Sequence, residues 1–138
     1  MKKIQQIQAE IVEDFAMFDD WMQKYEYLIS LGKELDPIAK KHKTEDNLIK
    51  GCQSRVWLHA EYTDGTIVYT ADSDAIMTKG IVAILISVLS GKPPSEISTA
   101  KLDFINKIGL KEQLSPTRAN GLLSMIKQMK LYALAYTK

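Results

Sequence analysis

One residue of this sequence combines a reactive side chain with a setting suited to covalent chemistry. Cys52 follows Gly51 and precedes Gln53 and Ser54, a small and polar context typical of an exposed turn rather than a core. A thiol in such a loop becomes a nucleophile when it gains thiolate character, which amide donors or a cation promote and an apolar pocket suppresses. The alternative is a buried cysteine that serves as a small hydrophobe. The loop context favours the reactive thiol.

Other chemistries that use cysteine find little support. His59 lies on the same expected strand, roughly 20 Å from Cys52 when the strand is extended, too far to be the base of a Cys-His hydrolase. His42 falls in a polar segment with no predicted position. One cysteine allows no internal disulfide and no zinc or iron–sulfur site made of the chain's own thiolates. The histidines and carboxylates also lack the spacing of metal ligands, so we expect no metal and no cofactor of its own.

Two aspartates and one arginine are further candidates. Asp72 and Asp74 look like paired carboxylates for acid–base catalysis, but capping of the following helix explains them better, because a capping oxygen accepts an otherwise unpaired amide hydrogen. Arg118 falls in the first turn of the last expected helix, where a cation opposes the helix dipole. Its guanidinium would suit a carboxylate such as Asp74 or an acidic partner. A merely solvated arginine is the alternative.

The composition is that of one globular domain. The chain has 138 residues, of which 46% are hydrophobic and 25% are charged, so we expect a single domain over residues 1–138. Its 18 Lys and Arg nearly balance its 17 Asp and Glu, and a net charge of +1 gives no bulk electrostatic reason to bind nucleic acid or an anionic membrane. We interpret the basic cluster at residues 40–43 as part of a solvated connection.

The first residues lack the pattern of an export signal. Gln5, Gln6, Gln8 and Glu10 stand where a signal peptide needs an apolar stretch, so we expect a cytoplasmic protein. The longest apolar run, residues 81–89, is about half of the ~20 residues needed to cross a bilayer. It favours a core helix over a membrane span.

Apolar spacing predicts two amphipathic helices at the start of the chain, the second ending at Gly32. A charged connection over residues 33–46 follows, with room for one helical turn. The apolar faces are marked by Ile4, Ile7, Ile11 and Phe15, and then by Trp21, Tyr25, Leu28 and Ile29.

Three more helices are expected in the second half of the chain. Ser73 or Asp74 should cap a helix that runs to about Ser90, and a short helix should cover residues 104–108. Ser115-Pro116 has the form of a helix cap followed by proline at the first helical position, and predicts a closing helix.

Alternating apolar residues at 56–71 predict a β-hairpin whose turn is Asp64-Gly65. A type I′ turn fixes the register, which pairs Thr63 with Thr66, Tyr62 with Ile67, Ala60 with Tyr69, Leu58 with Ala71, and Trp57 with Asp72. We therefore expect the segment that begins at Asp72 to lie beside the strand that leaves the cysteine loop, with Cys52 and Asp74 as neighbours. Residues 47–50 predict a short third strand.

Blocks of residues along nearly the whole chain resemble the SufE-type sulfur acceptors, partners of cysteine desulfurases in iron–sulfur cluster assembly. The blocks are Trp21, Lys24-Tyr25, Leu28-Ile29, Leu31-Gly32, Gly51-Cys52-Gln53-Ser54, Val56-Trp57, Ala71-Asp72-Ser73-Asp74-Ala75, Lys79-Gly80, Leu114-Ser115-Pro116, Arg118, and Asn120-Gly121-Leu122. Thr117 stands where serine is usual in the family.

The resemblance implies an α+β fold in which a three-stranded antiparallel sheet packs against helices, similar to the IscU scaffolds. Those scaffolds carry three cysteine ligands, and this chain has one, so it cannot hold a cluster in the same way. The implied reaction is transpersulfuration, in which Cys52 takes the outer sulfur of a desulfurase persulfide and later yields it to a scaffold. The pyridoxal phosphate belongs to the desulfurase.

The same resemblance implies a docking face formed by Gly51, Gln53, Ser54, Asp74 and Arg118 around the cysteine. Expected partners are a SufS-like desulfurase, which the protein stimulates, and a SufBCD-like scaffold, with no nucleic acid and no membrane. We expect a monomer or weak homodimer that acts as an accessory protein without turnover of its own.

Two hypotheses accompany this interpretation. The cysteine is sheltered near Trp57 in the free protein and swings out when the desulfurase docks. The alternative function is a non-enzymatic module that activates the desulfurase allosterically and carries no sulfur.

Overall fold

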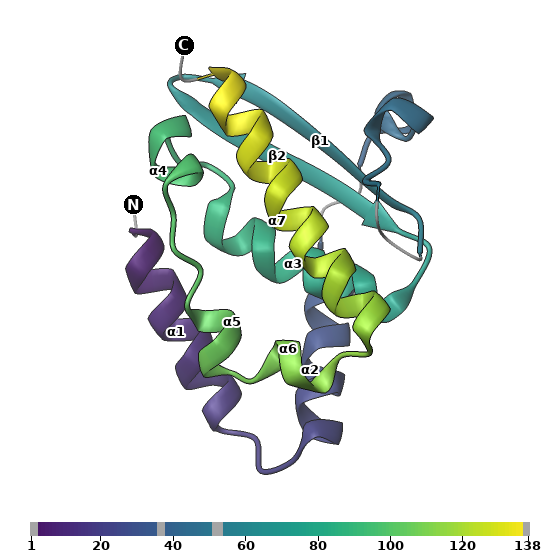
Figure 1. Cartoon of the computed structure of the whole chain (residues 1–138), viewed down its shortest axis with the longest axis vertical. Helices are drawn as coiled ribbons and strands as arrows, with labels where there is room; N and C mark the ends of the chain where they lie inside the picture. Colours follow the sequence, from purple (N-terminus) through teal and green to yellow (C-terminus); the bar gives the residue numbers. More distant parts are fainter. Residues whose placement is uncertain (1–2, 36–37, 51–53, 137–138) are drawn as a thin grey trace.

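A β-hairpin and the two longest helices form the centre of the fold in the computed structural model, which describes residues 3–35, 38–50 and 54–136 (Figure 1). The elements are α1 (Ile4–Ala16), α2 (Trp21–Lys33), η1 (Lys40–His42), η2 (Glu45–Asn47), β1 (Val56–Thr63), β2 (Thr66–Ser73), α3 (Ile76–Leu89), α4 (Pro94–Ser98), α5 (Phe104–Lys107), α6 (Leu110–Gln113) and α7 (Pro116–Tyr136), where η marks a 3-10 helix. The α+β class is confirmed.

The hairpin has the predicted register at every pair, from Thr63 with Thr66 to Trp57 with Asp72. Asp64 and Gly65 both have positive φ, 52° and 80°, as a type I′ turn requires. Alternate residues of the two strands are buried in the core they share with α3 and α7, and the buried hydroxyl of Tyr69 donates to the carbonyl of Met129 on α7.

The predicted third strand is wrong in extent. Within the described residues the sheet has two strands, and Leu48 forms only an isolated bridge with Trp57. Asn47 does not join a strand, because it is the last residue of the 3-10 helix η2 and its side-chain amide donates to the carbonyl of His42. The single backbone bond from Ile49 N–H to the carbonyl of Val56, 2.9 Å, remains.

Gly32 does not end α2 as predicted but lies one residue inside it. Its role is close packing, because a Cβ at Gly32 would lie 2.8 Å from the backbone nitrogen of Gly80 on α3. A Cβ at Gly80 would in turn collide with the carbonyl of Leu28 on α2. The two glycines let the backbones of α2 and α3 approach closely.

The predicted side-chain cap of α3 is also wrong. Ala75 precedes the first turn of α3, and no side chain of the described residues caps that helix. The carboxylate of Asp74 instead accepts from the backbone of Arg55 across the sheet. The predicted end of α3, the position of α5 and the start of α7 are confirmed: α3 ends before Ser90, and the Ser115 hydroxyl accepts from Arg118 N–H at 3.4 Å. The short helices α4 and α6 were not predicted.

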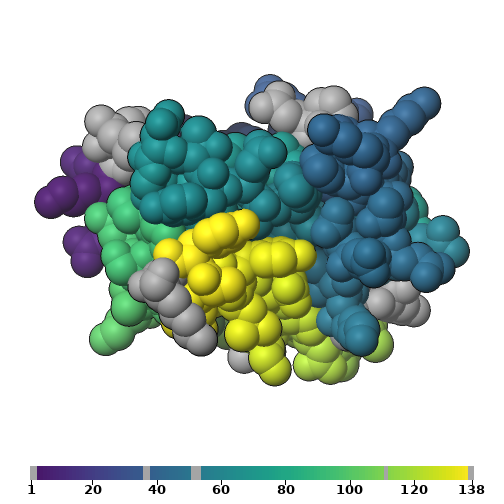
Figure 2. Space-filling model, turned by 90° about the horizontal axis from the view of Figure 1, so that it is seen from above, coloured from purple at the N-terminus to yellow at the C-terminus, as the bar shows by residue number. Residues whose placement is uncertain are grey.

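The C-terminal turns of α7, yellow in Figure 2, lie against both the teal hairpin and the blue segment near residues 40–50. This segment and α7 form the walls of a groove of about 410 Å³. None of the described helices is both long enough and apolar enough to span a membrane.

Candidate functional site

The cysteine loop is defined by its two flanks. Gly51, Cys52 and Gln53 lie outside the described residues, and the structure places Lys50 on one side of them and Ser54 on the other. The predicted neighbourhood of Cys52 and Asp74 is therefore not tested directly. The contacts of the flanks define the surroundings in which the thiol must work.

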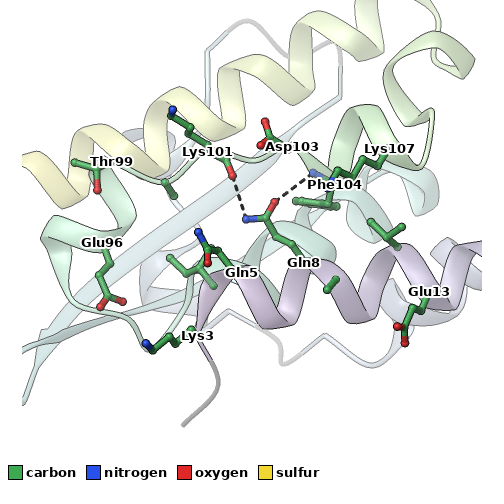
Figure 3. Close-up of a pocket in the computed structure, with 14 residues that line it drawn as sticks. Lys3, Gln5, Gln8, Glu13, Glu96, Thr99, Lys101, Asp103, Phe104 and Lys107 are labelled. Atoms are coloured by element: carbon green, nitrogen blue, oxygen red, sulfur yellow. Dashed lines mark hydrogen bonds between the residues drawn. The ribbon is translucent and has the colours of Figure 1, made fainter.

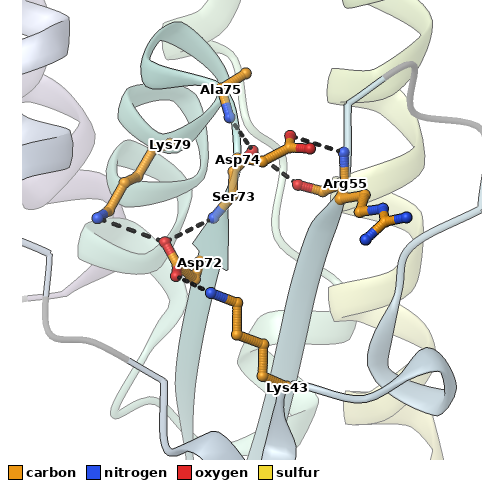
Figure 4. A network of polar contacts seen from close by, with 7 residues as sticks. All are labelled: Lys43, Arg55, Asp72, Ser73, Asp74, Ala75 and Lys79. Carbon is orange, nitrogen blue, oxygen red and sulfur yellow. Dashed lines mark hydrogen bonds and ion pairs between the residues drawn. The ribbon is translucent and has the colours of Figure 1, made fainter.

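The C-terminal flank is held by three hydrogen bonds to the backbone of Arg55 (Figure 4). Arg55 N–H donates to the carboxylate of Asp74 at 3.0 Å, and Asp74 N–H donates back to the Arg55 carbonyl at 3.2 Å. The hydroxyl of Ser73 donates to the same carbonyl at 2.8 Å. Residues 72–74, here called the acidic junction, thus fix the chain three residues after the cysteine.

The N-terminal flank lies on the sheet. Ile49 bonds to Val56 and Leu48 bridges to Trp57, so residues 48–49 run beside the start of β1. The preceding connection packs on the outer side chains of the same strand, where the ammonium of Lys43 lies 4.6 Å from the centre of the Trp57 ring. Such a cation–π contact adds attraction to the packing of the side chains.

Asp72 of the acidic junction is partly buried and forms ion pairs with two lysines. Lys43 Nζ lies 3.1 Å from Oδ2 and Lys79 Nζ lies 3.4 Å from Oδ1, while Ser73 N–H donates to Oδ1 at 2.8 Å. Partial burial acts to raise the pKa of Asp72, but the hydrogen bonds from Lys43 and Ser73 and the charge of Lys79 outweigh it and lower the pKa. Asp72 stays ionised and is poorly suited to donate a proton.

The two histidines meet each other, which the sequence did not reveal. The rings of His42 and His59 stack with centroids 3.5 Å apart and planes 8° apart. Burial lowers the pKa of His59 most, and the charge of His42 lowers it further; Glu61, 4.0 Å away, acts to raise it, and Lys41 adds a smaller lowering effect. His59 Nε2 is buried and has no hydrogen-bond partner among the described residues. His59 is therefore neutral near pH 7.

Arg118 lies in the first turn of α7, as predicted. It is exposed and forms no ion pair with any residue that the structure describes. The pair with Asp74 that its type suggested is absent from the described contacts, in which that carboxylate accepts from Arg55 N–H. Within the described residues no carboxylate pairs with the guanidinium, which suits it to an anion from outside.

Ser54 and Arg118 are brought together at a small cavity. The cavity has a volume of about 10 Å³, close to the least space that holds one water molecule. Its walls are formed by Ser54, Thr78, Ile81, Thr117, Arg118, Gly121 and Met125. Two predicted site residues that are distant in sequence thus lie at one small opening beside the cysteine loop.

Sequence reasoning missed Lys43 and Lys79 and was wrong about Ile76. Apolar spacing predicts that Ile76 is buried together with Ile84 and Val88, but its side chain is 64% exposed at the start of α3, two residues after Asp74. Lys43 was hidden in a charged run. Lys79 lies in the first turn of α3, which brings its ammonium 3.4 Å from Asp72.

A larger groove lies elsewhere on the described structure. It has a volume of about 990 Å³ and runs between α1 and residues 96–107 (Figure 3). Gln8 spans it by donating to the Lys101 carbonyl at 3.1 Å and accepting from Phe104 N–H at 3.2 Å. No described residue of the cysteine flanks lines this groove. The part of the chain that the structure describes also holds no group of three or more potential metal-ligating residues.

Solved structures support the fold. A hypothetical protein from Thermus thermophilus, known from its solution structure, superposes with a TM-score of 0.78 over 94% of this chain and 94% of its own. The two sequences are only 18% identical, so this similarity concerns the fold alone.

Sequence comparisons give the family. An uncharacterized SufE-like protein of Rhizobium meliloti (strain 1021) is 43% identical over 88% of this chain and 90% of its own length, and one of Synechocystis is 41% identical over 93% and 80%. SufE-like protein 1 of Arabidopsis thaliana, chloroplastic/mitochondrial, is 44% identical over 91% of this chain, which spans 34% of that longer protein. The family model SufE, described as an Fe-S metabolism associated domain, matches residues 9–133, and the chain belongs to the SufE family.

Proposed function

We propose that this protein accepts sulfur on Cys52 from a cysteine desulfurase and relays it to an iron–sulfur assembly scaffold. The Cys52 thiolate attacks the outer sulfur of the desulfurase persulfide. A new bond forms between Cys52 Sγ and that sulfur, the old sulfur–sulfur bond breaks, and the desulfurase cysteine leaves as a thiolate. The exchange consumes no external oxidant or reductant.

The observation that carries the proposal is a lone thiol placed between two anchored flanks in a member of the SufE family. Arg55 is bonded to Ser73 and Asp74 on one side, and Ile49 is bonded to Val56 on the other. A carrier needs a thiol that reaches a partner's active site without disturbing the domain. Anchors close to both ends of a short loop are suited to that task.

The proposed docking face surrounds the loop. It consists of Ser54, Asp74, exposed Ile76 and Arg118, together with Gly51 and Gln53 of the loop itself. An exposed apolar side chain and an arginine that lacks an ion partner in the described structure are both typical of a small protein interface. The desulfurase supplies the pyridoxal phosphate, and a SufBCD-like scaffold would receive the sulfur.

Shelter of Cys52 in the free protein belongs to the same proposal. The expected shelter is near Trp57, where Lys43 covers one face of the ring. Shelter matters because a persulfide is open to reduction and oxidation between donor and recipient.

Intact mass spectrometry tests the function. The protein is incubated with its desulfurase and free cysteine, and the expected product is a mass increase of one sulfur atom on the wild type and none on Cys52→Ser. An unmodified wild-type chain would refute the carrier function. A Cys52→Ser chain that stimulates the desulfurase fully would favour the allosteric alternative.

A further inference from the structure

The carboxylate of Asp72 joins parts of the chain that are distant in sequence (Figure 4). Lys43 reaches Oδ2 from the connection before the cysteine, and Lys79 reaches Oδ1 from α3. The three side chains are partly buried: 20% of the Asp72 side chain is exposed, against 40% for Lys43 and 33% for Lys79. Without the carboxylate, two ammonium groups would be left close together with no anion between them.

Lys43 connects Asp72 to the N-terminal flank of the cysteine loop, whereas Lys79 connects it to α3. Lys43 lies over Trp57, the residue to which Leu48 bridges, so it holds the N-terminal flank against the sheet. Asp72 itself pairs with Trp57 in the hairpin and continues into Ser73 and Asp74, which hold the C-terminal flank. One carboxylate therefore lies where both flanks and α3 meet.

The usual roles of an aspartate at this position do not explain Asp72. It does not cap α3, whose first turn has no side-chain cap. It is not a proton donor, because its lysine partners lower its pKa. A solvated surface carboxylate would not receive a lysine on each oxygen and a backbone N–H as well.

We propose that Asp72 is a positioning residue for sulfur transfer, which binds Lys43 and Lys79 on one carboxylate and so holds the two flanks of Cys52 in a fixed relative position. This inference rests on the proposed function of Cys52. It assigns to Asp72 no contact with the transferred sulfur. Asp72 acts through Lys43 on the segment that enters the loop.

The test compares Asp72→Asn, Lys43→Met and the double variant with a matched control, Asp64→Asn, in the exposed hairpin turn. Asparagine keeps an oxygen for Ser73 N–H but removes the charge that holds both lysines. The first measurement is the alkylation rate of Cys52 in the free protein, which needs no desulfurase. We expect a roughly three-fold increase for each single variant, the size typical of one partly exposed ion pair, and no change for Asp64→Asn.

The double variant and a conservative variant separate positioning from general loss of structure. Because Lys43 and Asp72 act as a pair, the double variant should alkylate no faster than Asp72→Asn, and Lys43→Arg should keep the wild-type rate. High salt screens the ion pairs, so it should remove the difference in Cys52 alkylation rate between the wild type and Asp72→Asn. With desulfurase present, Asp72→Asn should raise the carrier concentration for half-maximal stimulation about three-fold and leave the maximal rate unchanged.

Wild-type alkylation rates in both single variants, or independent effects that multiply in the double variant, would overturn the inference. An unchanged carrier concentration for half-maximal stimulation in Asp72→Asn would overturn it as well. Where Asp72→Asn fails to fold, Lys43→Met and Lys43→Arg decide the question alone. Failure of the proposed function has a different signature, which is a wild-type chain that gains no sulfur while the alkylation differences persist.

Discussion

Asp74 allows the anchoring of the cysteine flank to be separated from contact with a partner. Its carboxylate accepts from Arg55 N–H at 3.0 Å, and this bond alone depends on the side chain, since Asp74 N–H and the Ser73 hydroxyl hold the Arg55 carbonyl independently. Asp74→Ala removes one of three bonds. Asp74→Asn keeps an oxygen acceptor at the same place and removes only the charge.

The magnitude follows from that count. A hydrogen bond to a charged group contributes up to about 3 kcal/mol when buried, and exposure of Asp74 reduces the cost of its loss to about 1 kcal/mol. For a chain of this length we expect Asp74→Ala to lower Tm by about 4 °C and Asp74→Asn by less than half of that. Two bonds remain, so both variants should fold.

The assay is stimulation of the desulfurase at saturating and limiting carrier, with Tm measured on the same preparations. If Asp74 anchors the flank, Asp74→Asn should stimulate the desulfurase nearly as well as the wild type does. Asp74→Ala should stimulate it several-fold less. Ser73→Ala is the control without a change of charge: it removes a bond to the same Arg55 carbonyl and also the acceptor of Ala75 N–H. If Asp74→Asn and Asp74→Ala lose desulfurase stimulation equally, the anchoring role is refuted and Asp74 is assigned to a charged contact with the partner.

Four further results are expected. Arg118→Ala should weaken desulfurase stimulation several-fold with Tm within about 2 °C of wild type, because the side chain is exposed; an unchanged rate would remove it from the docking face. Gly80→Ala should cost about 2 kcal/mol by denaturant unfolding, because its Cβ meets the Leu28 carbonyl, and a more stable variant would contradict this packing. The lowered pKa of His59 means that the unfolded chain binds more protons below about pH 6.5, so the unfolding free energy should fall as pH drops from 6.5, and less so in His59→Gln. Cys52 should alkylate faster when the desulfurase is present, and equal rates would exclude shelter.

The hairpin was predictable because a two-residue turn and a period of two leave one register. Asp64-Gly65 requires positive φ at both positions, and every pair from Thr63 to Trp57 then follows. The position of Asp72 beside Trp57 was obtained in the same way. Turn chemistry and the alternation of apolar residues were therefore sufficient to predict the hairpin.

Prediction failed where distant contacts replaced local ones. Asp74 has the right type and place for a helix cap, yet its carboxylate accepts from Arg55, nineteen residues away along the chain. The connection that contains Lys43 has no apolar period, so nothing in its sequence indicates the contacts with Asp72 and Trp57 that fix it. The stack of His42 on His59 depends on that connection and was unpredictable for the same reason.

Recognition by this protein must be local, because 18 basic and 17 acidic residues leave almost no net field to steer a partner. The charges near the cysteine are divided accordingly. Asp72 and Asp74 are engaged within the chain by Lys43, Lys79 and the Arg55 backbone, whereas Arg118 has no ion partner in the described structure. A docking desulfurase would therefore meet Asp72, whose charge two lysines compensate, and Arg118, whose charge has no ion partner among the described residues. On this reasoning an acidic group of the desulfurase lies opposite Arg118, and stimulation should weaken with rising salt much less in Arg118→Ala than in the wild type.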